Sequence, residues 1–264
     1  MPVATVNEQS ITYADNEADG PAVIFSHGFL MDHTMFDEQV AALGDRYRCI
    51  RWDERGFGAT PATGPFTYWD SADDAVALLD HLGVEQATFV GMSQGGFLSL
   101  RAALAHPDRV RALALIDSQA AAEAPEVAAG YRGMIDHWLS DEPLGDVGQM
   151  VAGLILGDPG LSATWIDIWE QRRGPSMEYA AGALLDRDDI FDRLGEIACP
   201  VLSIHGDADQ AIPLEAAEAL QAAVPDGRGL VSVPGAAHAP NMTHPDIVNP
   251  ALAEFLDSLD RPFR

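Results

Sequence analysis

The sequence predicts an α/β protein in which helices cover both faces of a mostly parallel sheet. From residue 22 to residue 110, apolar runs with strand character alternate with stretches of helical periodicity. Parallel strands require such helical crossovers, which cover both faces of their sheet. From about residue 119 to residue 193 the alternation stops, and helical periodicity recurs without a convincing strand. The 264 residues, 47% of them hydrophobic, would form one large domain with an insertion.

The first buried strand is expected at residues 22–25, and a turn containing His27 and Gly28 follows it. Taken alone, a histidine–glycine pair after a strand is most simply a strand-ending turn whose imidazole bonds to the backbone. It gains meaning only in combination with the next motif along the chain.

The strand expected at residues 87–90 runs into the motif Gly-Met-Ser-Gln-Gly, which has Ser93 at its centre and a helical pattern directly after it. Glycines two residues before and after the serine fit a turn too tight for a Cβ atom. Such a turn holds the serine hydroxyl above the sheet. The backbone N–H of Gln94 would begin the helix, where unpaired donors and the helix dipole stabilise an anion. The pattern predicts a nucleophilic serine.

A base and an acid follow further along the chain. A strand expected at residues 201–204 precedes an acidic loop with Asp207 and Asp209, and a later strand leads to His238. A serine hydroxyl needs a base to take its proton, and a carboxylate on the far ring nitrogen orients that base. Asp117, at the end of the strand before the helical region, is a third candidate for the acid.

Together these segments resemble the α/β-hydrolase superfamily, in which the order serine, acid, histidine is the one found here. The resemblance covers nearly the whole chain and implies an eight-stranded, mostly parallel sheet flanked by helices, with a helical cap inserted after strand 6. Further segments that match the family are the Asp-x-Arg-Gly-x-Gly turn within 51–58, the helix-to-strand connection at 105–110 and the start of the last helix at 244–246. The implied core domain is 1–118 with 194–264, and the implied cap is 119–193.

The resemblance also implies the roles of individual residues. The family pattern Gly-x-x-Asp-x-x-x-Pro selects Asp209 as the acid, so the expected triad is Ser93, Asp209 and His238. The backbone N–H groups of Phe29 and Gln94 are the expected oxyanion hole. No cofactor and no metal is expected.

Substrate contacts are expected from residues beside the nucleophile and from apolar side chains of the cap. Most cap side chains must pack against the core, yet as flexible or aromatic pocket walls they favour a substrate with an apolar moiety. The expected contacts are His27, Gly28, Met92, Met134, Trp138, Trp165 and Trp169.

Charge narrows the possible partners. The chain has 41 acidic and 15 basic residues, a formal net charge of −26 and no lysine. This excludes a lysine Schiff base and a P-loop lysine, and it disfavours nucleic acid or an anionic membrane as a partner. Self-repulsion predicts that salt stabilises the fold, a prediction that a melting temperature unchanged up to molar NaCl would contradict. Whether this composition reflects a salt-rich habitat stays open.

The start of the sequence lacks the basic and apolar regions of a signal peptide, and no run approaches the roughly 20 apolar residues of a membrane span. We therefore expect a cytoplasmic protein, monomeric or homodimeric. The expected activity is hydrolysis of a carboxylic ester or lactone through an acyl-enzyme on Ser93.

Two alternatives stay open. In size and cap the chain is similar to 3-oxoadipate enol-lactonases and to C–C bond hydrolases of aromatic degradation. The latter usually have Asn before and Met after the serine, where this chain has Met92 and Gln94. The other alternative is a small-molecule receptor that keeps the hydrolase fold.

Overall fold

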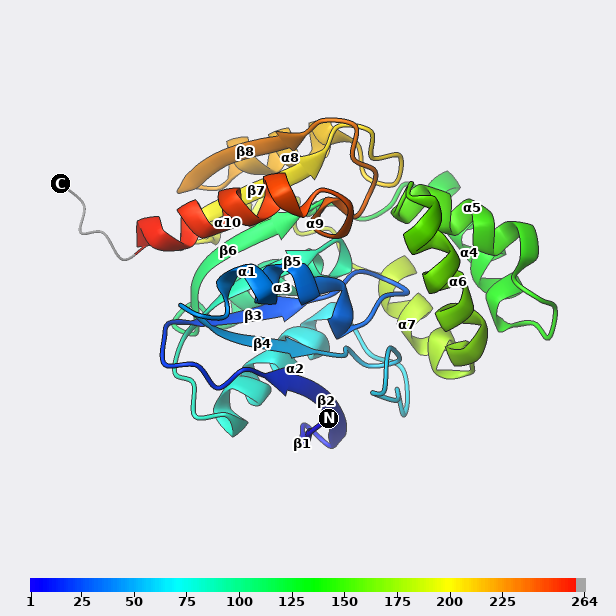
Figure 1. Cartoon of the computed structure of the whole chain (residues 1–264), viewed down its shortest axis with the longest axis horizontal. Helices are drawn as coiled ribbons and strands as arrows, with labels where there is room; N and C mark the ends of the chain where they lie inside the picture. The colour runs from blue at the N-terminus through cyan, green and yellow to red at the C-terminus, as the bar shows by residue number, and fades with distance from the viewer. Residues whose placement is uncertain (260–264) are drawn as a thin grey trace.

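A computed structural model describes residues 1–259, and an eight-stranded sheet forms its centre (Figure 1). The strands are β1 (Val3–Val6), β2 (Gln9–Asp15), β3 (Ala22–Ser26), β4 (Arg48–Trp52), β5 (Ala87–Met92), β6 (Val110–Ile116), β7 (Val201–Gly206) and β8 (Gly227–Val233). Their order in the sheet is β1-β2-β4-β3-β5-β6-β7-β8. Pairing is antiparallel for β1 with β2 and for β2 with β4, and parallel for the other neighbours.

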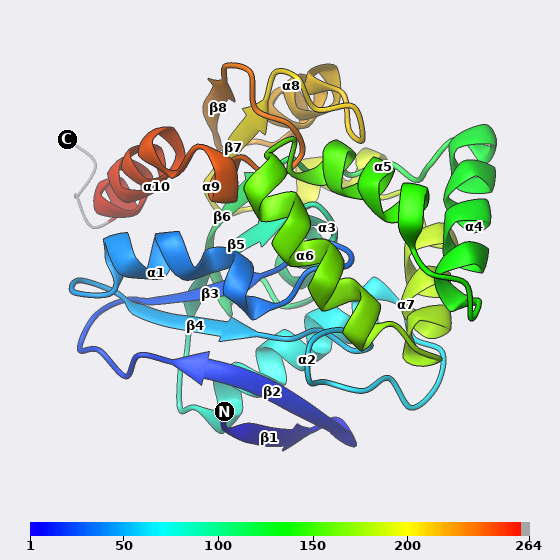
Figure 2. The same ribbon diagram turned by 45° about the vertical axis from the view of Figure 1, so that its right-hand side comes forward.

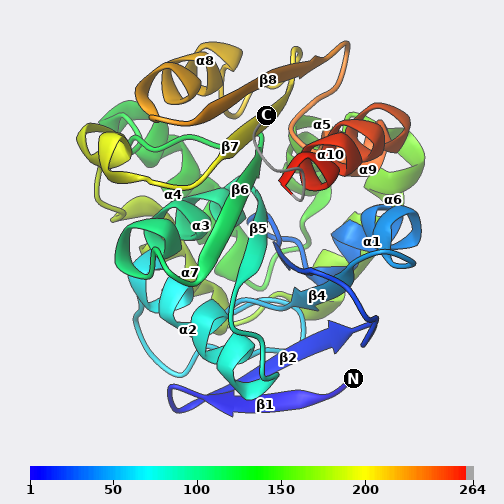
Figure 3. The ribbon, with the colours of Figure 1, turned by 90° about the vertical axis from the view of Figure 1, so that its left-hand side faces the viewer.

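Side chains that alternate along the central strands pack into two separate apolar layers. Val23 and Phe25 of β3 point into one layer, whereas Ile24 points into the other. Figure 3 shows the helices that cover these two faces. Helices α1 (Asp37–Leu43) and α10 (Pro245–Leu259) cover the first face, and α2 (Tyr68–His81), α3 (Gln94–Ala105) and α8 (Leu214–Ala223) cover the second. Strands β3, β5, β6 and β7 are buried on both sides, as their mostly apolar sequences predict.

The segment between β6 and β7 is helical, as its periodicity predicts. It contains α4 (Pro125–Leu139), α5 (Gly145–Ile155), α6 (Pro159–Arg172) and α7 (Ser176–Leu185). Figures 1 and 2 show these four helices gathered at one end of the sheet, beyond the carboxyl ends of the parallel strands. The predicted sheet with a helical insertion after its sixth strand is therefore confirmed. Three short helices complete the fold: η1 (His33–Phe36), η2 (Phe191–Glu196) and α9 (Pro240–Thr243).

Polar contacts tie the helical insertion to the core. The indole N–H of Trp169 in α6 donates a 2.8 Å hydrogen bond to the carbonyl oxygen of Leu30, in the loop after β3. In the same loop, Asp32 forms an ion pair with Arg172, which is also on α6. Leu30 has a φ of +67°, so the loop backbone there is strained and depends on such contacts. Among residues 1–259, none of the helices combines the length and the apolarity needed to cross a membrane.

Candidate active site

Ser93 lies on a sharp turn between β5 and α3, with φ of +51°. Close packing explains the two glycines of the motif. A Cβ atom on Gly95 would lie 1.9 Å from the carbonyl oxygen of Ser26, and one on Gly91 would lie 2.2 Å from that of Gly95. Only glycine permits this approach of α3 to the end of β3. The turn therefore holds Ser93 in a strained conformation at the carboxyl edge of the sheet.

The loops after β7 and β8 bring an acid and a base together. His238 Nδ1 lies 2.7 Å from Asp209 Oδ2, and the Asp209 side chain is completely buried. The other oxygen, Oδ1, accepts hydrogen bonds from the backbone N–H groups of Ala211 and Ile212 at 2.8 and 3.2 Å. Burial alone would raise the pKa of Asp209, but contacts with His205 and His238 outweigh it and hold that pKa well below its usual range. Asp209 is therefore an anion that orients His238.

Neither of the two rival carboxylates is paired with His238 within residues 1–259, although Asp117 lies close to Asp209. Asp207 accepts the backbone N–H of Gly235 at 2.6 Å, which makes it a loop-bracing group. Asp117, fully buried at the end of β6, accepts the N–H of Gly206 at 3.0 Å. Burial and the charge of Asp209 raise the pKa of Asp117 well above its usual value. Asp117 is therefore harder to ionise than an exposed aspartate, and the histidine it pairs with is His205, at 3.6 Å, rather than His238.

Two backbone donors lie near the serine: Gln94 follows Ser93 directly, and Phe29 lines the same cavity. Within residues 1–259, the N–H groups of Phe29 and Gln94 donate to no backbone or side-chain acceptor. Gln94 N–H is the first of α3, so the helix itself supplies no acceptor for it. Trp169 fixes the carbonyl of the residue after Phe29, as described above. An anion beside Ser93 would satisfy both donors.

A cavity of about 50 Å³ contains both Ser93 and His238, and its wall is mainly apolar. Met92 and Met134, two of the expected substrate contacts, belong to this wall. The wall is formed by Phe29, Leu30, Met31, Met92, Ser93, Phe97, Glu123, Tyr131, Met134, Val151, Leu154, Ile155, Leu184, Ala211, Ile212 and His238.

Five of the expected substrate contacts lie away from this cavity wall, which corrects our expectation for their side chains. Trp138, Trp165 and Trp169 line a separate small cavity between α6 and the core, where Trp169 contacts Trp138 edge-on and Trp165 in a tilted arrangement. Large aromatic surfaces there pack the insertion onto the sheet. The His27 ring is fully buried: its Nε2 accepts the N–H of Glu54 at 3.0 Å, and its Nδ1 lies 2.8 Å from the Gly28 carbonyl oxygen.

Gly28 serves the packing of the same turn. A Cβ atom at this position would lie 2.4 Å from the sulfur of Met92, so glycine lets the loop after β3 approach the end of β5. His27 and Gly28 thus shape the loop that carries Phe29, and neither residue is part of the cavity wall.

The sequence analysis missed Glu123 and Tyr131 as wall residues, because helical periodicity does not reveal which cap side chains reach the core. Ala211 and Ile212 were detectable: they lie between Asp209 and Pro213, and a loop that delivers the acid must bring its neighbours along.

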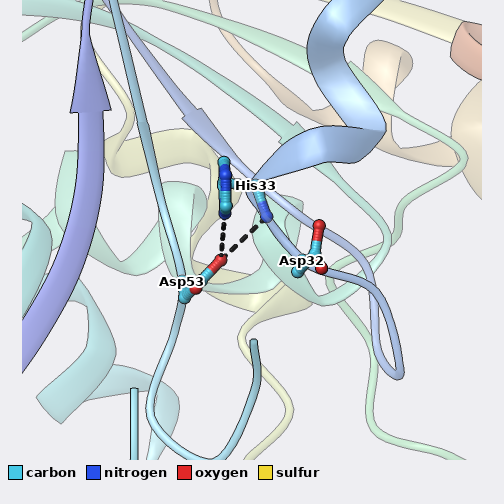
Figure 4. A group of neighbouring side chains, drawn as sticks. All are labelled: Asp32, His33 and Asp53. Carbon is cyan, nitrogen blue, oxygen red and sulfur yellow. Dashed lines mark hydrogen bonds and ion pairs between the residues drawn. The ribbon is translucent and has the colours of Figure 1, made fainter. Parts of the chain in front are cut away.

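Two clusters contain residue types that bind metals. In the first, shown in Figure 4, Asp53 Oδ1 accepts the backbone N–H of His33 at 2.9 Å and lies 2.7 Å from His33 Nδ1. Asp53 Oδ2 accepts Ala59 N–H, and the oxygens of Asp32 bind Thr34 and Arg172. All four carboxylate oxygens are thus engaged in holding loops together.

The second cluster is Asp117, His205 and Asp209. His205 Nε2 lies 2.9 Å from the carbonyl oxygen of Ile212. A carbonyl only accepts, so this nitrogen carries a proton and is not free to bind a metal. The cluster instead supports Asp209, the carboxylate that contacts His238.

Comparison with known proteins identifies the family of the chain. Residues 21–245 match the alpha/beta hydrolase fold family. The chain is 31% identical over 214 residues to 3-oxoadipate enol-lactonase 2 of Acinetobacter baylyi, covering 78% of both proteins. It is 29% identical to pimeloyl-[acyl-carrier protein] methyl ester esterase of Aeromonas hydrophila, covering 86% of this chain and 91% of that protein. A thermophilic esterase from Thermogutta terrifontis superposes with a TM-score of 0.89 at 28% identity, covering 98% and 97% of the two chains. The protein is therefore a hydrolase of the α/β-hydrolase family, similar to esterases and lactonases.

Proposed function

We propose that this protein hydrolyses a carboxylic ester or a lactone through an acyl-enzyme on Ser93. The observation that carries the proposal is the contact of His238 with the buried Asp209 in a loop that meets the cavity of Ser93. Relatives that are named as an enol-lactonase and a methyl ester esterase support a carboxylic ester as the substrate class.

The reaction begins at the serine hydroxyl. Ser93 Oγ attacks the carbonyl carbon while His238 accepts the hydroxyl proton, and Asp209 stabilises the resulting imidazolium. The N–H groups of Phe29 and Gln94 hold the negative oxygen of the tetrahedral intermediate. His238 then gives its proton to the leaving alcohol, which leaves an acyl group on Ser93. Water activated by His238 releases the acid and restores the serine.

The cavity wall favours substrates with an apolar part. Methionine, leucine, isoleucine and phenylalanine side chains form most of it, so an aliphatic or aromatic chain would lose water there favourably. A small, uncharged ester or lactone with such a chain fits the site best.

The test is hydrolysis of p-nitrophenyl esters from acetate to octanoate, with a simple lactone measured alongside and Ser93→Ala as the control. We expect activity that falls by about 10⁵-fold or more in the variant while its melting temperature is retained. Equal activity in both proteins would refute the role of Ser93. Tight ligand binding without turnover of any ester or lactone would favour a receptor instead.

A further inference from the structure

One acidic side chain lies in the mainly apolar wall of the cavity beside Ser93. Among the wall residues that the structure describes, Glu123 is the one carboxylate, and no arginine accompanies it there. Glu123 lies in the segment that links β6 to α4, and Tyr131 and Met134 of α4 line the same cavity. An isolated carboxylate in such a wall is costly to bury unless a partner supports it.

Arg187 is that partner, and it stands behind the carboxylate. Glu123 Oε1 accepts hydrogen bonds from Arg187 Nη2 at 2.7 Å and from the side-chain amide of Gln119 at 3.2 Å. The guanidinium also donates to the carbonyls of Leu184 and Ala121 and lies 4.4 Å from the ring centroid of Phe97. These contacts fix Arg187, which is only 8% exposed, outside the cavity wall.

The second carboxylate oxygen of Glu123 is available to a ligand. Oε2 has no hydrogen-bond partner within residues 1–259, and it is not among their fully enclosed unpartnered atoms. The side chain is 11% exposed. Glu123 therefore binds the arginine through one oxygen and leaves the other unpaired, and its side chain lines the cavity of Ser93.

Glu123 also lies where the cavity meets the surface. A groove of about 990 Å³ between α4, α5 and the Asp209 loop shares several wall residues with the cavity, Glu123 and Tyr131 among them. Two of its other walls, Val127 and Met150, are large apolar side chains that are 42% and 61% exposed. A ligand that enters from this apolar groove passes Glu123 before it reaches Ser93.

We propose that Glu123 is a specificity-determining residue, which makes the site select substrates with an uncharged chain and reject those whose chain carries a carboxylate. Two carboxylates in a cavity of low dielectric repel strongly, and like charges placed together are a common means of rejecting wrong ligands. This proposal rests on the proposed ester hydrolysis and names the substrate class of that same site.

The test compares pairs of esters that differ only in charge. p-Nitrophenyl hydrogen glutarate and its methyl ester carry the difference on the acyl side, and 4-acetoxybenzoate and its methyl ester carry it on the alcohol side. In at least one pair we expect kcat/KM to favour the neutral ester by about 100-fold. In E123Q, whose amide oxygen still accepts from Arg187, the preference should fall by about tenfold, mainly because the anionic ester reacts faster.

The matched control is E126Q. Glu126 is exposed in the first turn of α4, so this variant makes the same change in net charge outside the cavity. Its preference should stay within about twofold of the wild-type value. Equal effects of E123Q and E126Q, or no preference in either pair for the wild-type protein, would overturn the proposal.

A measurement on the wild-type protein keeps the test valid even if E123Q does not fold. Salt screens the distant charges of a chain with net charge −26 but acts far less on a buried contact. The ratio of kcat/KM for the neutral ester to that for the anionic ester should therefore stay high between 0.05 and 1 M NaCl. A ratio that falls to about one at 1 M NaCl would overturn the role of Glu123. If neither ester of any pair shows Ser93-dependent hydrolysis, the proposed function fails and this proposal fails with it.

Discussion

The sheet edge and the cap contribute to the site in different ways. Ser93 and Asp209 lie in turns at the carboxyl ends of β5 and β7, where backbone hydrogen bonds and close-packed glycines fix them. Met134 of α4 and Glu123, just before that helix, belong to the helical insertion and line the cavity beside Ser93. In the mechanism we propose, the sheet edge supplies the reacting groups, and in our proposal on Glu123 the cap selects the substrate.

The largest expected effect distinguishes two aspartates of the sheet edge. Asp209→Asn should lower kcat on an ester by about 10⁴-fold, because an amide cannot hold His238 in the required tautomer or stabilise its charged form. Asp117→Asn should lower it no more than a few-fold, because the amide oxygen can still accept the N–H of Gly206. Steady-state kinetics on p-nitrophenyl butyrate measure both values.

Melting temperatures of both variants serve as the control for folding. A larger loss of kcat in Asp117→Asn than in Asp209→Asn would mean that Asp117, and not Asp209, is the acid that supports His238.

The next effect tests the link between the two regions. Trp169→Phe removes the N–H that binds the Leu30 carbonyl, so the loop carrying Phe29 loses a restraint. We expect kcat/KM to fall about tenfold and stability to fall by about 1 kcal/mol. The comparison variant is Trp69→Phe, which removes an indole bond to Asp188 away from the cavity. A similar loss of kcat/KM in both variants would show that the Leu30 contact has no special effect on catalysis.

The variant expected to affect catalysis least concerns a fully buried carboxyl, and its main effect is on stability. Glu54 is fully buried, and burial raises its pKa well above the ordinary value of 4.5, although the neighbouring Gln94 amide partly opposes the shift. The folded protein therefore retains a proton that the unfolded chain releases, and stability is lost as pH rises above about 4.5. Glu54→Gln cannot ionise and should escape this loss.

Urea unfolding at pH 5, 6 and 7 provides the measurement. The gain in unfolding free energy of Glu54→Gln over the wild-type protein should grow by about 1.4 kcal/mol per pH unit until the raised pKa is reached. A gain that is constant over this range would mean that Glu54 ionises alike in both states. The Gln94 side chain neighbours Glu54 and also accepts a 3.1 Å hydrogen bond from the Tyr68 hydroxyl. The kcat of Glu54→Gln, measured in parallel, therefore reports whether these side-chain contacts also position the backbone N–H of Gln94.

The sequence was most informative where function needs a special backbone. The glycines of the strand-to-helix turn indicated Ser93, and the resemblance to α/β-hydrolases then implied Asp209, four residues before Pro213, and His238 as its partners. Strands β5 to β7 could be expected because both their faces are buried and their sequences are continuously apolar.

The cap was less predictable for a physical reason. An apolar residue on a cap helix can face the substrate or the core, and periodicity gives the same signal for both. Trp169 and its two aromatic neighbours were expected at the substrate, but their large surfaces pack the cap onto the sheet. Glu123 gave no signal, because its importance depends on Arg187, which is distant in sequence.

Our proposed mechanism depends above all on Ser93 as the nucleophile. Intact-protein mass spectrometry after reaction with diethyl p-nitrophenyl phosphate, followed by peptide mapping, tests this role. We expect one diethylphosphoryl group per wild-type chain, located on Ser93, and none on Ser93→Ala. Equal labelling of the variant, or a label on another residue of the wild-type protein, would contradict it.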